Sequence, residues 1–183
     1  ASVAPQVENS IHHEHSCTVR NTLKANMEIK VLGAHSLESR DTRHSCFLID
    51  SVMAVDAGSL ASALTPSEQA QVGVVLLTHG HFDHTQDLKM VAEKTGAPVA
   101  GMVELMGYFS AQGVENTTGF NKGGTIRCGK VNVTMVPASH SSSVDGDAGP
   151  VYMGAEIGFM IKGEGRTIYV SGDTDIMADM DWM

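Results

Sequence analysis

The stretch Thr78-His79-Gly80-His81-Phe82-Asp83-His84 directly follows the apolar run 72–77. A continuous apolar run of this length is typical of a strand that is buried on both faces. Three imidazoles and a carboxylate within six positions are ligand types for zinc or a similar divalent ion. A loop that leaves a buried strand can turn its first two histidines toward one point and its aspartate and last histidine toward a neighbouring point. The glycine between the first two histidines permits the sharp path.

The alternative interpretation of this stretch is a polar loop whose histidines cap the next helix. A lone histidine is usually a structural residue, but four ligand side chains in one strand-to-helix turn favour a metal site. The sequence therefore predicts a metal centre at the end of a buried strand.

Two later residues also follow the ends of expected strands. His140 comes after the strand that ends near Pro137, and Asp173 comes after the apolar segment 168–170. Each residue is ambiguous when taken alone. In a layered fold, however, loops that follow different strands can converge on one rim, so the two residues join the candidate site.

The chain from residue 27 onward alternates between strand and helix signals. Helices that lie between strands favour an α/β fold built in layers, which can also be described as a layered α+β fold. One short helix is expected to begin at Pro66, after the N-cap residue Thr65, and two further helices are expected to span 87–94 and 103–112. The expected strands are 27–33, 45–50, 52–55, 72–77, 99–101, 125–128, 130–136, 155–162 and 166–170.

The spaced pattern His79-x-His81-x-Asp83-His84, with His140 and Gly172-Asp173-Thr174, resembles the metal-binding series of the metallo-β-lactamase superfamily. The stretches 95–99, 121–125 and 133–143 resemble a narrower group, the uncharacterised metal-dependent hydrolases related to L-ascorbate-6-phosphate lactonase. The closer match runs from about residue 78 to residue 183. The resemblance implies a four-layer αββα sandwich with the metals at one edge of its two sheets.

The resemblance also implies a set of roles for individual side chains. Asp83 would both bind a metal and accept a proton from the attacking water, and Asp56 would support the site by orienting ligands. Asp56 fits equally well as the first residue of a turn. The cofactors implied are two divalent metal ions, with zinc first and Mn, Fe or Ni as alternatives. Their ligands would be His79, His81 and His140 at the first metal, Asp83 and His84 at the second, and Asp173 bridging both.

One part of the family pattern has no counterpart in this sequence. The family continues past the Gly-Asp-Thr strand through a further strand and helix, which supply a last histidine for the second metal. We therefore expect the sandwich to lack its C-terminal strand and helix segment. A fragment, a weakened second site, or a partner chain or second copy that covers the exposed edge would each explain this difference.

Composition limits the classes of protein to which the chain can belong. Its 183 residues suit one domain, and we divide them into a polar N-terminal extension, 1–26, and a hydrolase domain, 27–183. The net charge of −9 argues against nucleic acid as the main partner. No apolar run approaches the ~18 residues of a membrane span. Three widely spaced cysteines and no signal-peptide core favour the cytoplasm, with Cys46 and Cys128 as buried side chains.

The sequence thus predicts a metal-dependent hydrolase, in which a metal-activated water or hydroxide attacks a small ester, lactone or phosphoester. The partner expected is a small-molecule substrate. Two alternatives stay open: a metal-dependent phosphodiesterase, and a metal-binding fragment without catalytic activity.

Overall fold

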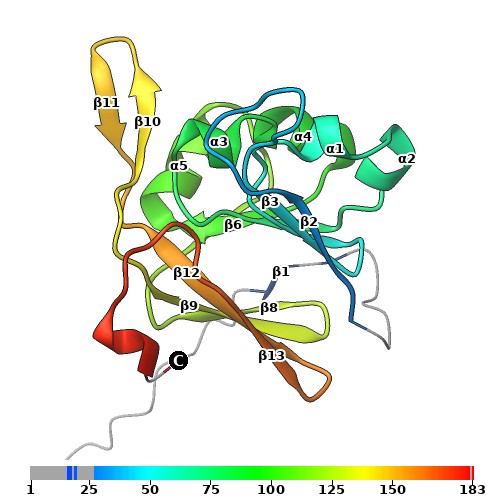
Figure 1. Cartoon of the computed structure of the whole chain (residues 1–183), viewed down its shortest axis with the longest axis vertical. Helices are drawn as coiled ribbons and strands as arrows, with labels where there is room; N and C mark the ends of the chain where they lie inside the picture. The colour runs from blue at the N-terminus through cyan, green and yellow to red at the C-terminus, as the bar shows by residue number, and fades with distance from the viewer. Residues whose placement is uncertain (1–15, 18, 20–26, 182) are drawn as a thin grey trace, which may run out of the picture.

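The computed structural model describes residues 16–17, 19, 27–181 and 183, and it contains two stacked β-sheets and a separate hairpin (Figure 1). The six-stranded sheet has the order β2 (Ile29–Gly33), β3 (Cys46–Ile49), β4 (Met53–Val55), β5 (Val74–Leu76), β6 (Val99–Met102) and β7 (Thr117–Phe120). The five-stranded sheet has the order β1 (Ser16–Cys17), β8 (Thr125–Cys128), β9 (Val131–Pro137), β12 (Ile157–Gly163) and β13 (Arg166–Val170).

The helices lie on one side of the six-stranded sheet, and the five-stranded sheet lies on its other side (Figure 1). They are α1 (Leu60–Ala63), α2 (Pro66–Gln69), α3 (Phe82–Thr85), α4 (Leu88–Thr95) and α5 (Val103–Ala111), and a 3-10 turn, η1 (Ala178–Asp181), follows the last strand. Within the described residues, no α-helix covers the outer face of the five-stranded sheet. The predicted layered α/β sandwich is therefore confirmed, with three of its four layers in the described part.

Apolar side chains from both sheets form one core. Phe159 on β12 is fully buried and stacks on Phe120 of β7, with 6.3 Å between the ring centroids. Cys46 and Cys128 are buried in the same core, as predicted. Burial of such side chains is the main favourable contribution to folding.

Local signals explain several of the predicted elements. Thr65 and Glu68 form a reciprocal capping box at the start of α2. Gly96 ends α4 with a φ of 64°, a left-handed conformation that glycine adopts without steric cost. No helix of the described chain is long and apolar enough to cross a membrane.

Some elements were not predicted. The strand β7, the short helices α1 and α3, and the hairpin formed by β10 (Ser143–Gly146) and β11 (Gly149–Tyr152) lack a clear apolar period. The hairpin extends away from the body of the molecule (Figure 1). Ser16 and Cys17 pair in parallel with Arg127 and Cys128, so part of the predicted N-terminal extension joins the sheet. The remainder of 1–26, apart from residue 19, lies outside the described residues, and the domain boundary at residue 27 stays a prediction.

The topology brings four strand ends to one edge of the sandwich. β4 and β5 run parallel, so the segments that follow Val55 and Leu76 leave the six-stranded sheet side by side. β9 and β13 are both antiparallel to β12, so they run in the same direction and their carboxyl ends lie at a common edge. Asp56 follows β4, and the candidate ligands follow the other three strands.

Candidate metal centre

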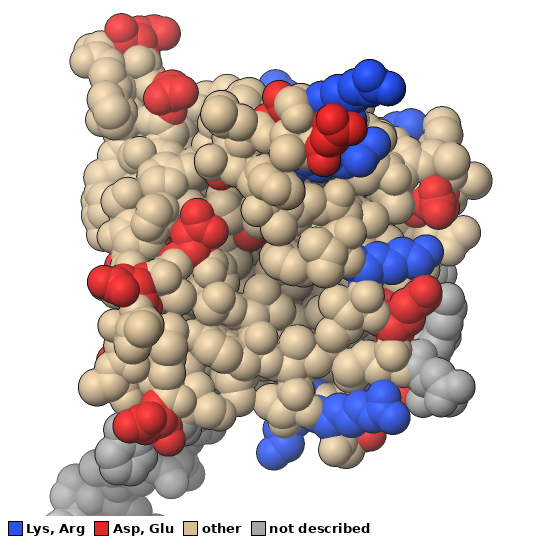
Figure 2. Space-filling view, viewed as in Figure 1, with Lys and Arg blue, Asp and Glu red and all other residues tan. Residues whose placement is uncertain are grey.

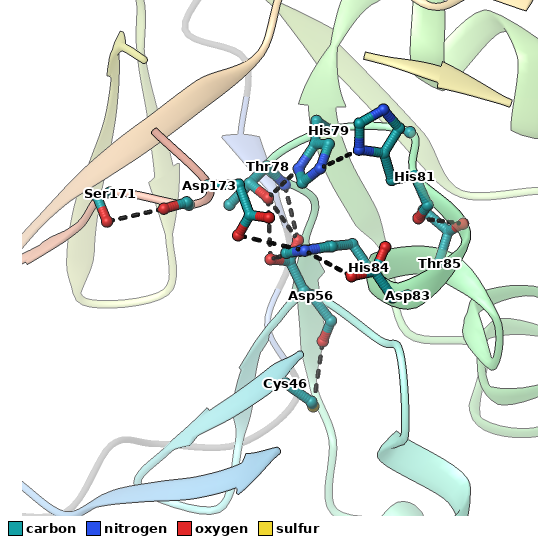
Figure 3. Close-up of polar contacts among 12 residues, drawn as sticks. Cys46, Asp56, Thr78, His79, His81, Asp83, His84, Thr85, Ser171 and Asp173 are labelled. Atoms are coloured by element: carbon teal, nitrogen blue, oxygen red, sulfur yellow. Dashed lines mark hydrogen bonds and ion pairs between the residues drawn. The ribbon is translucent and has the colours of Figure 1, made fainter. Parts of the chain in front are cut away.

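The loop after β5 places three histidine rings next to one another (Figure 3). His79 Nε2 lies 3.0 Å from His81 Nδ1, and the rings of His79 and His84 have centroids 4.1 Å apart. His84 lies in α3, one turn after the loop, and is buried together with His79. Gly80 permits a close approach of the segment after β9, because a Cβ at this position would lie 2.9 Å from the carbonyl oxygen of Ser143.

The loops after β9 and β13 are joined by hydrogen bonds. Asp175 N donates to Ser139 O at 2.9 Å, and Ser139 N donates to Thr174 Oγ1 at 2.9 Å. This connection brings His140 and Asp173 together at the rim. His140 packs edge-on against the rings of His79 and His81, at centroid distances of 5.2 and 5.1 Å.

Asp173 lies between His84 and His140. Its Oδ1 is 3.4 Å from His84 Nε2, and its Oδ2 is 3.8 Å from His140 Nε2. The Asp173 carboxylate thus faces His84 through one oxygen and His140 through the other, and its role as a bridging ligand stays a prediction. Asp83 Oδ2 lies 3.6 Å from His84 Nε2.

Two overlapping groups of side chains have donor atoms close enough to hold a metal ion. The atoms of each group lie within 4.8 Å of one another, and the groups are His79, His81 and His140, and His79, His84 and Asp173. Imidazole nitrogens with one carboxylate suit zinc and similar divalent ions, so the donor set fits the predicted metals. The structure brings all six predicted ligands together, but it places Asp83 beside His84 only. How the ligands divide between two metals, and the place of Asp83 at the second, stay predictions.

Asp56 supports the histidines from beneath (Figure 3). It follows β4, is 1% exposed, and adopts a φ of 61°, which is uncommon for a residue other than glycine. Its Oδ2 accepts a hydrogen bond from His84 Nδ1 at 2.7 Å. Asp56 therefore contacts a candidate ligand directly, and a role as a turn residue alone does not explain its burial.

Thr78 was missed by the sequence analysis as a functional residue. Its backbone N–H and its hydroxyl both donate to Asp56, and its Oγ1 also lies 3.0 Å from His79 Nδ1. The threonine is adjacent to His79 in sequence, but only the contact with Asp56 across 22 positions reveals its place in the site. The hydroxyl of Ser141, the residue after His140, lies 3.3 Å from His81 Nε2.

Burial and neighbouring charges shift the pKa values of the cluster in opposite directions. Burial, followed by the nearby His84, His81 and His140, lowers the pKa of His79 to about 2. Burial and His140 also lower the pKa of His81. At His84, burial opposes the charged ring, but the hydrogen bond and charge of Asp56, with the charges of Asp173 and Asp83, raise the pKa to about 9.

A cavity of about 490 Å³ opens beside His84 and Asp173. The described residues that line it include no lysine or arginine, and its wall is largely apolar, with Ile29, Phe47, Ile49, Ile168 and Val170. In Figure 2 the lysine and arginine side chains gather on the side away from the β10–β11 hairpin, whereas acidic side chains lie over the hairpin. The surroundings of the cluster are therefore neutral or acidic.

Curated relatives of the chain are metal-dependent hydrolases by name. A UPF0173 metal-dependent hydrolase of Dinoroseobacter shibae is 50% identical over 146 residues, which cover 75% of this chain and 63% of the relative. Another from Paracoccus denitrificans is 48% identical over 149 residues, covering 76% of this chain and 64% of the relative. The chain thus spans less than two thirds of the length of these relatives.

Solved structures share the fold. Igni18, a metallo hydrolase from Ignicoccus hospitalis, superposes with a TM-score of 0.62 at 27% identity, covering 76% of this chain and 62% of that chain. The metallo-beta-lactamase fold protein YhfI from Bacillus subtilis gives 0.65 at 19% identity, covering 84% and 65%, which is a likeness of fold alone. A family model described as a beta-lactamase superfamily domain matches residues 46–183, three quarters of the sequence. The resemblance noted from the histidine pattern is thereby confirmed, and the chain belongs to the metallo-β-lactamase superfamily.

Proposed function

We propose that the chain is a metal-dependent hydrolase that acts on a small ester, lactone or phosphoester. The observation that carries the proposal is the convergence of six His and Asp side chains, from the three segments that follow β5, β9 and β13, at one edge of the sandwich. The names of the relatives support the same activity. Hydrolysis needs no serine or cysteine nucleophile at such a centre, because a divalent ion lowers the pKa of water and polarises the scissile bond.

The side chains of the cluster divide the remaining work. His79 and His81 are buried or half-buried and stay neutral, so their ring nitrogens remain available as ligands. Asp173 faces both His84 and His140 and orients their rings relative to each other. We assign Asp83 the role of proton acceptor, because its side chain is 17% exposed and its carboxylate reaches the rim beside His84.

The lining of the cavity favours an uncharged substrate. Phosphoesters are usually held by lysine or arginine, and the described lining residues include neither. The apolar wall suits the hydrocarbon part of a carboxylic ester or lactone. A phosphodiesterase therefore ranks second, and a metal-binding fragment without activity ranks third.

The remaining assignments extend this proposal. We assign two divalent ions to the site, with zinc first because the donors are mainly imidazoles. We place the protein in the reducing cytoplasm, on the strength of its buried Cys46 and Cys128. β13 is an outer strand of its sheet in the described part, and a second copy or partner is proposed to cover this edge.

Metal content and hydrolysis test the proposal together. The chain is purified without chelator, and metal per chain is measured by elemental analysis, with His79→Ala as the control. Hydrolysis of an aryl ester, a lactone and an aryl phosphodiester is then compared. Metal uptake with ester or lactone hydrolysis that is lost in His79→Ala supports the proposal. Turnover of the phosphodiester alone would establish the second candidate, and no metal in either protein would refute the functional assignment.

A further inference from the structure

One buried carboxylate contacts one candidate ligand directly and lies one hydrogen-bonded residue away from a second. Asp56 Oδ2 lies 2.7 Å from His84 Nδ1, and Thr78 Oγ1 lies 2.9 and 3.0 Å from the two oxygens of Asp56. The same Thr78 oxygen lies 3.0 Å from His79 Nδ1. A continuous path of hydrogen bonds therefore runs from His84 through Asp56 and Thr78 to His79 (Figure 3).

The chemistry of the groups fixes the direction of each bond. A carboxylate only accepts hydrogen bonds, so the Thr78 hydroxyl proton points to Asp56, as does the Thr78 backbone N–H at 2.9 Å. The Thr78 oxygen is then left as an acceptor, and the bond to His79 requires a proton on Nδ1 of that ring. His84 likewise donates from Nδ1 to Asp56.

We propose that Thr78 is a positioning residue that extends the influence of Asp56 to His79, so that one carboxylate sets the ring orientation of two candidate ligands and the tautomer of His79. In His79 the proton on Nδ1 leaves Nε2 bare, which is the state that a metal ion binds. In His84 the bond from Nδ1 to Asp56 turns Nε2 toward Asp173, so Nε2 is the nitrogen that would lose its proton and bind a metal. His79 belongs to both candidate ligand groups, and His84 belongs to the second. The two groups therefore depend on a common support.

The backbone around Asp56 is built to hold the carboxylate in place. Asp56 takes a left-handed φ of 61°, and such a conformation persists only where the surroundings enforce it. Asp56 N donates to Leu76 O at 2.8 Å, and Cys46 Sγ donates to Asp56 O at 3.2 Å. Ala57 N donates to His84 O at 2.8 Å, which ties this segment to the histidine that Asp56 contacts.

The test replaces the Thr78 hydroxyl by a methyl group, in Thr78→Val, and restores it in the matched variant Thr78→Ser. Nitrogen-15 NMR of metal-free protein reports which ring nitrogen of His79 carries the proton. We expect Nδ1–H in the parent and in Thr78→Ser, and loss of that preference in Thr78→Val. Zinc affinity, measured by competition with a chelator, should fall about 10- to 100-fold in Thr78→Val and return in Thr78→Ser. Unchanged tautomer and affinity in Thr78→Val would overturn the proposal.

A second variant separates the link from a merely local effect. Asp56→Asn should change the tautomer of His79 and the ring-nitrogen signals of His84, because both rings depend on the same carboxylate. If only His84 changes, the connection through Thr78 does not exist. The inference rests on the proposed metal centre, but the tautomers are measured without metal, so the NMR result stands even if no substrate is hydrolysed. Circular dichroism confirms that each variant is folded.

Discussion

Gly172 offers the sharpest test of how the second sheet meets the metal loop. Its φ is 62°, and a Cβ at this position would lie 2.8 Å from Thr78 Cβ and 2.8 Å from the carbonyl oxygen of Ile157. Gly165, in the turn between β12 and β13, has a similar φ of 73° but no heavy atom within 4 Å of such a Cβ. Gly172→Ala and Gly165→Ala therefore impose the same backbone cost but differ in crowding.

The expected magnitudes follow from these two terms. A left-handed conformation costs an alanine about 1–2 kcal/mol, which applies to both variants. Overpacking against backbone and a buried side chain adds about 1–3 kcal/mol, which applies to Gly172→Ala alone. The free energy of unfolding should thus fall by about 2–5 kcal/mol in Gly172→Ala, and Tm should fall by roughly 5–15 °C for a chain of this size.

Urea denaturation of both variants, monitored by circular dichroism, measures the two costs. The difference between the two free energies of unfolding isolates the crowding term, because the backbone term cancels. Metal affinity should also fall in Gly172→Ala, since the added methyl group displaces the loop that carries Asp173. Equal losses of stability in the two variants would refute the claimed close approach of Gly172 to Thr78.

Three further predictions concern the titration of the cluster and the core. In metal-free protein the pKa of His84 is raised to about 9, so the contribution of this residue to stability is fully present below about pH 6.5 and is lost as the pH rises through 9. Tm should therefore fall over this pH range in the parent and fall less in His84→Gln. Parallel curves of Tm against pH for the two proteins would contradict this raised pKa. Because His84 is protonated at pH 7, metal uptake there should release about one proton, which calorimetry in two buffers of different ionisation enthalpy detects as a difference in heat. Phe159→Ala should lower the free energy of unfolding by about 3–5 kcal/mol, whereas Tyr152→Ala, at a side chain that is 70% exposed, should change it by less than about 0.5 kcal/mol in the same urea titration.

The sequence was sufficient to predict the elements whose signals are local. The apolar run before Thr78 became β5, and the capping residues of α2 and the glycine after α4 marked their helices correctly. The candidate ligands could also be named, because four of them lie within six positions and the other two follow strands. The pattern carried this information without any knowledge of the spatial arrangement.

The elements and residues that were missed have weak local signals or depend on long-range contacts. The strand β7 has a short sequence without apolar alternation, and its pairing with β6 determines its conformation. The β10–β11 hairpin pairs locally, but it too was missed because its sequence lacks a clear apolar period. Thr78 gains its role only through Asp56, which is 22 positions away. No periodicity reports such a contact, so the supporting layer of the site could not be predicted beyond Asp56 itself.

The candidate ligands come from both sheets: His79, His81 and His84 follow a strand of the first, whereas His140 and Asp173 follow strands of the second. A metal ion bound by residues from both sheets would link the two sheets at this edge of the sandwich. The free energy of metal binding would then stabilise the packing of the two sheets, because the ligands come together only when the sheets are packed against each other. Loss of the metal should therefore weaken the contact between the two sheets before either sheet unfolds. Amide hydrogen exchange would rise first in the loops that meet at this edge.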